Sequence, residues 1–148
     1  MIKKISYLAL TVFILNLIWE FSHHYFYIDL TKIPHNLHLF LASFADVIII
    51  LFLFMVISIN LKKRSFYFDW INNPRKKDYT KFIIISIFFA FIWEIINLSL
   101  GRWQYTSKMP LIFGVGLSPL LQLAITGSLG LFINSFFKIT PSVFTKSS

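Results

Sequence analysis

Four long apolar segments constrain this chain more than any other feature of its sequence. They cover residues 6–26, 38–60, 81–100 and 113–137. Each is long enough to cross a hydrocarbon core of about 30 Å as a helix that rises ~1.5 Å per residue. Lipid offers the backbone no hydrogen-bond partner, and these segments lack the strict alternation of membrane β-strands. We therefore expect an all-α integral membrane protein, with four transmembrane helices in a single domain, 1–148.

Composition and charge agree with a membrane location. Hydrophobic residues make up 57% of the chain and charged residues only 14%, whereas soluble domains carry about 25% charged residues. The net charge of +8 would suggest nucleic acid if the basic residues formed one surface. Because they cluster in the connections between the apolar segments, membrane headgroups explain them better. The chain has no cysteine, which excludes disulfides and thiolate chemistry.

The basic residues also predict an orientation. The largest group lies in the connection 61–80, which holds six of the 14 lysines and arginines, and Lys81 follows directly. Two lie before the first apolar segment and two after the fourth, whereas the two remaining connections hold three between them. By the positive-inside rule, both termini and this basic loop are cytoplasmic in a multi-pass protein of the cell membrane. We expect the loop, including Trp70, to lie against anionic headgroups.

A repeated triplet indicates an internal duplication. Ile-Trp-Glu occurs at 18–20 and again at 92–94, each time inside an apolar segment. Aligning the two copies divides the chain into two helical pairs, 6–60 and 81–137. Repeats with two helices each are parallel and related by an axis along the membrane normal.

Two further positions follow the same alignment. If the second outer connection is two residues longer, Pro34 aligns with Pro110, and Asp46 then aligns with Gln122. The duplication would bring Glu20 and Glu94 to a similar depth, near the outer ends of two outgoing helices.

Three carboxylates lie inside the predicted spans. A charge at the centre of a bilayer costs at least about 2.5–3.5 kcal/mol, so Glu20, Asp46 and Glu94 should face the interior of the bundle. They are our candidate catalytic residues, as donors or acceptors of protons. The alternative is that their hydrogen bonds only hold the helices together.

Polar and aromatic residues recur at helical spacing around these carboxylates. In the fourth segment a small or polar residue stands at every fourth position from Gly114 to Asn134, a pattern typical of close helix packing in lipid. An aromatic belt at the membrane boundary explains most of the tryptophans and tyrosines, and Arg102 could meet a lipid phosphate or pair with Glu94. The substrate-binding candidates are Asn16, Asn97, Gln122, Trp19, Trp93, Arg102, Trp103 and Tyr105.

The four histidines, His23, His24, His35 and His38, are weak candidates for metal ligands. Glu20 and His23 have the i, i+3 spacing of di-iron helical bundles. The second copy has Asn97 in place of the histidine, so the set of ligands is incomplete. We expect no cofactor.

Residues 101–125 resemble part of the membrane-bound lycopene cyclase domain of carotenoid biosynthesis. The resemblance covers about a sixth of the chain, and it rests on Gly101, Trp103, Tyr105, Gly114, Gly116 and Pro119. It implies a repeated helical fold and an isoprenoid-like substrate. The paired glutamates implied in catalysis would fall at Leu121 and Gln122, neither of which is acidic. The family's repeated units also have three helices rather than two, so no catalytic residue is carried over.

Three functions fit these features. The first is a small membrane protein with an outward-facing carboxylate and aromatic site that binds, or acts as an enzyme on, a lipid or isoprenoid-like molecule. The second is a non-catalytic subunit or homo-oligomer whose polar residues hold helices together. The third is a small proton-coupled transporter. The expected partners are membrane lipids, an apolar small molecule and a second copy of the chain, and not nucleic acid.

Overall fold

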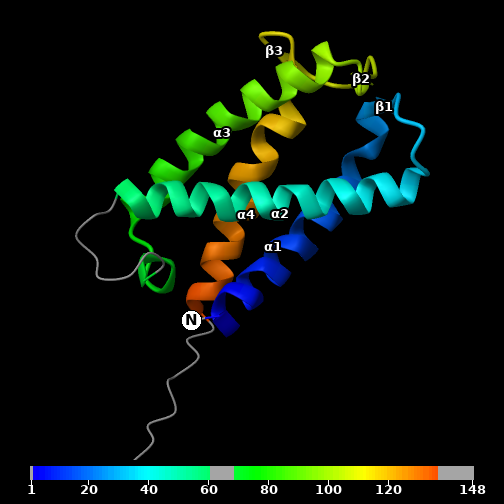
Figure 1. Ribbon diagram of the computed structural model, residues 1–148. Helices are drawn as coiled ribbons and strands as arrows, with labels where there is room; N and C mark the ends of the chain where they lie inside the picture. Colours follow the sequence, from blue (N-terminus) through cyan, green and yellow to red (C-terminus); the bar gives the residue numbers. More distant parts are fainter. Residues whose placement is uncertain (1, 61–68, 137–148) are drawn as a thin grey trace, which may run out of the picture.

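Four helices dominate the computed structural model, which describes residues 2–60 and 69–136. Each is long and apolar enough to cross a membrane, which confirms the four predicted helical segments (Figure 1). The helices are α1 (Ile2–His23), α2 (His35–Asn60), α3 (Lys76–Ser99) and α4 (Leu117–Phe136).

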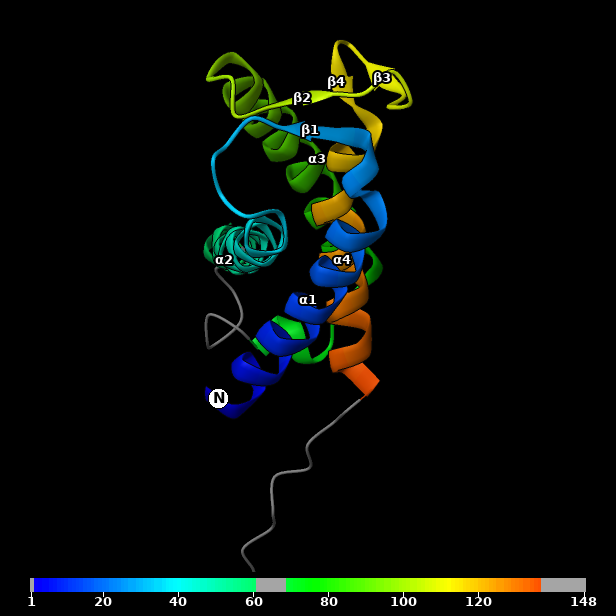
Figure 2. The same ribbon diagram turned by 90° about the vertical axis from the view of Figure 1, so that its right-hand side faces the viewer.

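The helices are splayed rather than parallel. Figure 1 shows α2 running across α1 and α4, and Figure 2 shows α2 nearly end-on while α1 and α4 run down the view. The start of α1, the end of α4 and the ends of α2 and α3 that flank 61–68 lie toward one side of the molecule. Four short strands lie at the other. The four predicted helices therefore form a bundle in which α2 crosses α1 and α4.

Helix α4 is the most buried of the four, with more than half of its span inside the protein. Two glycines allow its neighbours to approach closely. A Cβ atom at Gly127 would lie 2.3 Å from Cζ of Phe82 in α3, and one at Gly130 would lie 2.6 Å from Cγ2 of Val12 in α1. The two glycines thus leave room for side chains of α3 and α1 to pack against the backbone of α4. Small residues commonly have this role between helices in lipid.

The connections between α1 and α2 and between α3 and α4, which the all-α prediction left as loops, form two small sheets. Strand β1 (Tyr27–Asp29), after the short 3-10 helix η1 (His24–Phe26), pairs antiparallel with β2 (Trp103–Tyr105). Strand β3 (Leu111–Ile112) pairs with β4 (Val115–Gly116). Pairing satisfies backbone groups that would otherwise need partners where the helices end.

The second sheet also moves the start of α4. The hairpin turns through Phe113 and Gly114, which have φ angles of 52° and 81°, as a two-residue turn between antiparallel strands requires. Helix α4 therefore begins at Leu117 and not at the predicted residue 113.

Helix α3 starts earlier than predicted, at Lys76 instead of residue 81. The Asp78 side chain accepts a hydrogen bond from the backbone N–H of Arg75 at 2.9 Å and caps the first turn of the helix. Such a cap satisfies N–H groups that have no partner within the helix. The basic connection is shorter than expected, and its residues 61–68 lie outside the described residues.

Trp70 was also predicted wrongly. It belongs to a short 3-10 helix, η2 (Asp69–Asn72), and only 1% of it is exposed. Its indole N–H donates to Oγ of Ser58 at 2.7 Å, and its ring packs edge-on against Phe54. The residue is part of the core beneath α2 and does not lie at the headgroups. A tryptophan in a basic connection gives no sign of this from sequence, because the contact depends on the path of α2.

Candidate functional site

A cavity of about 320 Å³ lies among the four helices, near the end that carries the strands. Its lining comes from the last turns of α1 and α3, the first half of α2, the start of α4, and strands β1 and β2. All three predicted intramembrane carboxylates, Glu20, Asp46 and Glu94, line it. The structure thus brings together side chains that are as far apart in the sequence as Glu20 and Glu94.

Gln122 connects two of these carboxylates. Its amide nitrogen Nε2 donates to Oε1 of Glu20 and to Oδ2 of Asp46, both at 2.7 Å. The two carboxylate oxygens therefore lie at most two hydrogen-bond lengths apart. Gln122 is buried in α4, Glu20 lies on α1 and Asp46 on α2. One amide group ties three helices together at the floor of the cavity.

Asn16 extends this network below the cavity. Its Oδ1 atom is 3.3 Å from Nε2 of Gln122 and accepts a hydrogen bond from Oγ1 of Thr126 at 3.1 Å. Its own amide donates to the carbonyl of Val12. Asn16 is fully buried and does not line the cavity. Asn16 therefore supports Gln122 from below the lining, and its predicted role in substrate binding stays a prediction.

Glu94 has a different set of partners. The Tyr105 hydroxyl donates to Oε2 of Glu94 at 2.5 Å, and the Trp103 indole N–H donates to the same atom at 3.2 Å. Burial raises the pKa of Tyr105, and its hydrogen bond to Glu94 raises it further. The phenol therefore remains a donor at neutral pH. Glu94 is only 5% exposed, so strand β2 fixes a buried carboxylate at the cavity wall.

Each of the three carboxylates uses only one of its oxygens. Within the described part of the chain, all hydrogen bonds to these groups reach Oε1 of Glu20, Oδ2 of Asp46 and Oε2 of Glu94. The second oxygen of each group has no protein partner there. The Tyr27 hydroxyl, which also lines the cavity, likewise makes no hydrogen bond to a described residue. The site therefore has unused hydrogen-bonding groups, most of them acceptors.

Arg102 binds an amide in the cavity wall, and its predicted contact with a lipid phosphate stays a prediction. Its Nη1 atom donates to Oδ1 of Asn97 at 2.9 Å, and both side chains line the cavity. The amide of Asn97 donates to the carbonyl of Trp93 at 2.7 Å. No ion pair joins Arg102 to Glu94 among the described residues. The arginine is exposed, and no lysine of the described residues lines the cavity.

The histidines are distributed without forming a metal centre. His38 binds the carboxylate of Asp29, while His24 and His35 line the cavity with ring centroids 5.2 Å apart. His23 lies outside the cavity lining, stacked on Trp19 at 4.4 Å. Within residues 2–60 and 69–136, no three histidine or carboxylate side chains gather as metal ligands do.

Asp29 was not predicted from the sequence, yet it lines the cavity mouth. Partial burial opposes its ionisation, but hydrogen bonds from Thr31 and His38 outweigh this effect and lower the pKa of Asp29. The Thr31 backbone N–H donates at 2.8 Å. Its position depends on the pairing of β1 with β2, for which the sequence gives no periodic signal.

The aromatic candidates divide into two groups. Trp93 and Trp103 line the cavity together with Tyr27. Burial and the nearby carboxylates raise the pKa of Tyr27, so its hydroxyl stays protonated. Trp19 lies away from the cavity, where its indole N–H approaches Oγ of Ser118 at 3.3 Å.

Comparisons with protein-family models, with curated proteins and with solved structures found no match to this chain. The cavity and its residues therefore carry the functional inference.

Proposed function

We propose that this protein is an integral membrane protein whose outer cavity binds an apolar, isoprenoid-like or lipid molecule and presents carboxylates to it. The observation that carries this proposal is the 320 Å³ cavity, in which Glu20, Asp46 and Glu94 each keep one oxygen free. Aromatic and aliphatic side chains form much of the remaining wall. A mainly apolar wall with a few polar groups is typical of small-molecule sites.

The distribution of side chains supports insertion in a membrane. Large apolar residues are exposed along the helices, among them Ile84 at 62% and Phe88 at 67%, whereas Asn16, Asn97 and Gln122 are buried. In water this arrangement would leave much apolar surface uncovered. In lipid it places each kind of side chain in a suitable surrounding.

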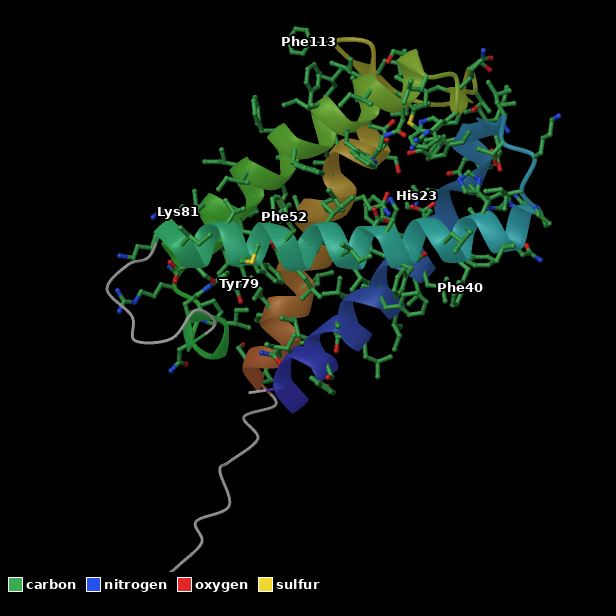
Figure 3. The ribbon with its side chains drawn as sticks, viewed as in Figure 1. His23, Phe40, Phe52, Tyr79, Lys81 and Phe113 are labelled. Atoms are coloured by element: carbon green, nitrogen blue, oxygen red, sulfur yellow. The ribbon has the colours of Figure 1, made fainter. Side chains whose placement is uncertain are left out.

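The orientation follows from the two ends of the molecule. Figure 3 shows Lys81 near the start of α3 and Phe113 at the opposite end, where it stands clear of the ribbon. Phe113 is 92% exposed at the tip of the β3–β4 hairpin. We assign the end with the basic residues, both termini included, to the cytoplasm and the cavity to the outer side.

The pairing of β1 with β2 supports an internal duplication. The alignment of Pro34 with Pro110 also aligns Ile28 with Gln104, and these two residues face each other at the centre of the sheet. The flanking bonds follow the same symmetry. The N–H of Leu30 donates to the carbonyl of Arg102 at 3.1 Å, and that of Thr106 donates to Phe26 at 2.9 Å. Any antiparallel pair has such reciprocal bonds, so the support comes from the register, which places aligned residues opposite each other.

The resemblance to lycopene cyclase domains gives the proposal its substrate class. Two of the residues that carry it, Trp103 and Tyr105, hold Glu94 at the cavity wall. Gln122, which takes the place of a family glutamate, lies between Glu20 and Asp46. We infer that Glu20, Asp46 and Glu94 transfer or stabilise protons in this chain, in place of the missing pair.

A second candidate function is that of a non-catalytic subunit or homo-oligomer. It is favoured by the hydrogen bonds of Gln122, which connect α1, α2 and α4 whether or not a ligand binds. In that case the carboxylates serve only to hold the helices together.

Native mass spectrometry of the protein purified in mild detergent distinguishes the two functions. The wild-type chain is compared with a Glu20→Gln, Glu94→Gln double variant and with a Lys108→Gln control, which changes an exposed residue outside the cavity lining. We expect a defined apolar molecule on the wild type and on the control, reduced at least about tenfold on the double variant. Bulk lipid alone on all three would contradict a ligand site, and loss of assembly in the double variant would favour the second candidate.

A further inference from the structure

The cavity lining contains carboxylate oxygens that accept no hydrogen bond from a described residue. Four carboxylates line the cavity, Glu20, Asp29, Asp46 and Glu94, and Asp29 is already bound by His38 and Thr31. Each of the other three has a free oxygen. Glu94 is the most informative, because it is 95% buried and its Oε1 has no partner among the described residues.

The basic side chains of the described lining are Arg102, His24, His35 and His38, and of these only His38 bonds to a carboxylate. Arg102 is the single arginine in the lining, and its guanidinium donates to the neutral amide of Asn97. His38 is committed to Asp29. Buried carboxylates are favourable only when they are paired or hydrogen-bonded, so a ligand that brings positive charge and N–H donors suits this site.

We propose that the ligand of this cavity is an amphiphilic amine, whose protonated nitrogen lies among the carboxylates of Glu20, Asp46 and Glu94 while its apolar body lies against Trp93 and Trp103. This inference rests on the proposed binding function and specifies its ligand class. Charge-assisted N–H bonds to carboxylates are about twice as strong as neutral ones. The tryptophan rings supply apolar area and also tolerate a cation near their faces.

Three probes of one shape separate charge from hydrogen bonding and from apolar contact. They are 4-phenylbutylamine, 4-phenyl-1-butanol and pentylbenzene, which carry an ammonium, a hydroxyl or a methyl group at the same position. Binding to the full chain in lipid nanodiscs is measured by equilibrium dialysis with mass spectrometry, and binding to empty nanodiscs is subtracted. We expect the amine to bind at least tenfold more tightly than the alcohol, and the hydrocarbon to bind most weakly.

Variants connect the effect to the carboxylates. Glu94→Gln and Asp46→Asn should each weaken amine binding about tenfold, which corresponds to 1.4 kcal/mol, and leave alcohol binding within twofold. Retained alcohol binding shows that the cavity has kept its shape. Lys108→Gln, which changes the net charge by one outside the cavity, should alter neither affinity.

The outcomes separate this inference from the proposed function. If the alcohol and the hydrocarbon bind as tightly as the amine, and Glu94→Gln has no effect, the amine inference is wrong while an apolar binding site remains. If no probe binds above the level of empty nanodiscs, both the ligand class and the binding function are contradicted.

Discussion

Replacing Gly127 with leucine is expected to destabilise the protein by about 3 kcal/mol or more, since overpacking a buried contact typically costs 1–3 kcal/mol even for smaller additions. A Cβ atom alone at this position would lie 2.3 Å from Cζ of Phe82, and Phe82 is completely buried. The Phe82 ring also packs against Phe54, with ring centroids 4.8 Å apart, so it has little room to move aside. The free energy of unfolding in mixed detergent micelles, followed by far-UV circular dichroism, measures the loss.

A double-mutant cycle shows whether this contact is the cause. Phe82→Ala should cost about 3–5 kcal/mol by itself, and in the Gly127→Leu protein it should cost much less, because the leucine fills the space of the ring. Leu129→Phe also enlarges α4, but at a residue that is 44% exposed, and should have little effect. Additive losses in the double variant would mean that α3 and α4 do not meet at Gly127.

Gln122→Leu is expected to destabilise the protein by at least about 2 kcal/mol, because each buried acceptor left without a donor costs about 1–3 kcal/mol. The substitution removes the donor shared by Glu20 and Asp46. It keeps a side chain of similar size in α4, so little of the effect comes from packing. The same unfolding measurement applies.

The matched experiment removes an acceptor as well. Adding Asp46→Leu to the Gln122→Leu protein should recover part of the lost stability, since replacing both partners with apolar groups can be nearly neutral. Asp46→Leu alone should be destabilising. A double variant as unstable as the sum of the two single variants would show that Gln122 and Asp46 do not interact.

Hydrophobicity made the helices predictable, and helical spacing made the buried polar residues predictable. The apolar segments located all four helices, although their ends were misplaced where a local cap or turn decides. Asp78 and Arg75 start α3 early, and Phe113 and Gly114 delay α4. These are single-residue effects, and a hydropathy pattern averages over them. The carboxylates could be singled out because lipid makes a charge in a span costly.

The pairing of residues across the cavity was not predictable in the same way. That Gln122 would meet Glu20 and Asp46, or Tyr105 would meet Glu94, depends on how α2 crosses α1 and on the pairing of β1 with β2. Such contacts are set by tertiary packing, for which periodicity in one segment contains no information. Trp70 is a further example. The sequence predicts it at the membrane boundary, whereas tertiary packing places it in the core.

The central claim is that a water-accessible cavity reaches the three carboxylates, and cysteine labelling tests it most directly. The chain has no cysteine, so only an introduced thiol can react. Ala42→Cys places a thiol on the cavity lining, Lys81→Cys places one near the opposite end, and Phe88→Cys places one on the apolar exterior. Intact cells are treated with a thiol reagent that cannot cross membranes, and labelling is read by mass spectrometry. We expect the cysteine at position 42 to be labelled in intact cells, the one at 81 only after the cells are opened, and the one at 88 in neither case. If the cysteine at 42 stays unlabelled in both intact and opened cells, no water-accessible cavity reaches these carboxylates, and the proposed site is contradicted.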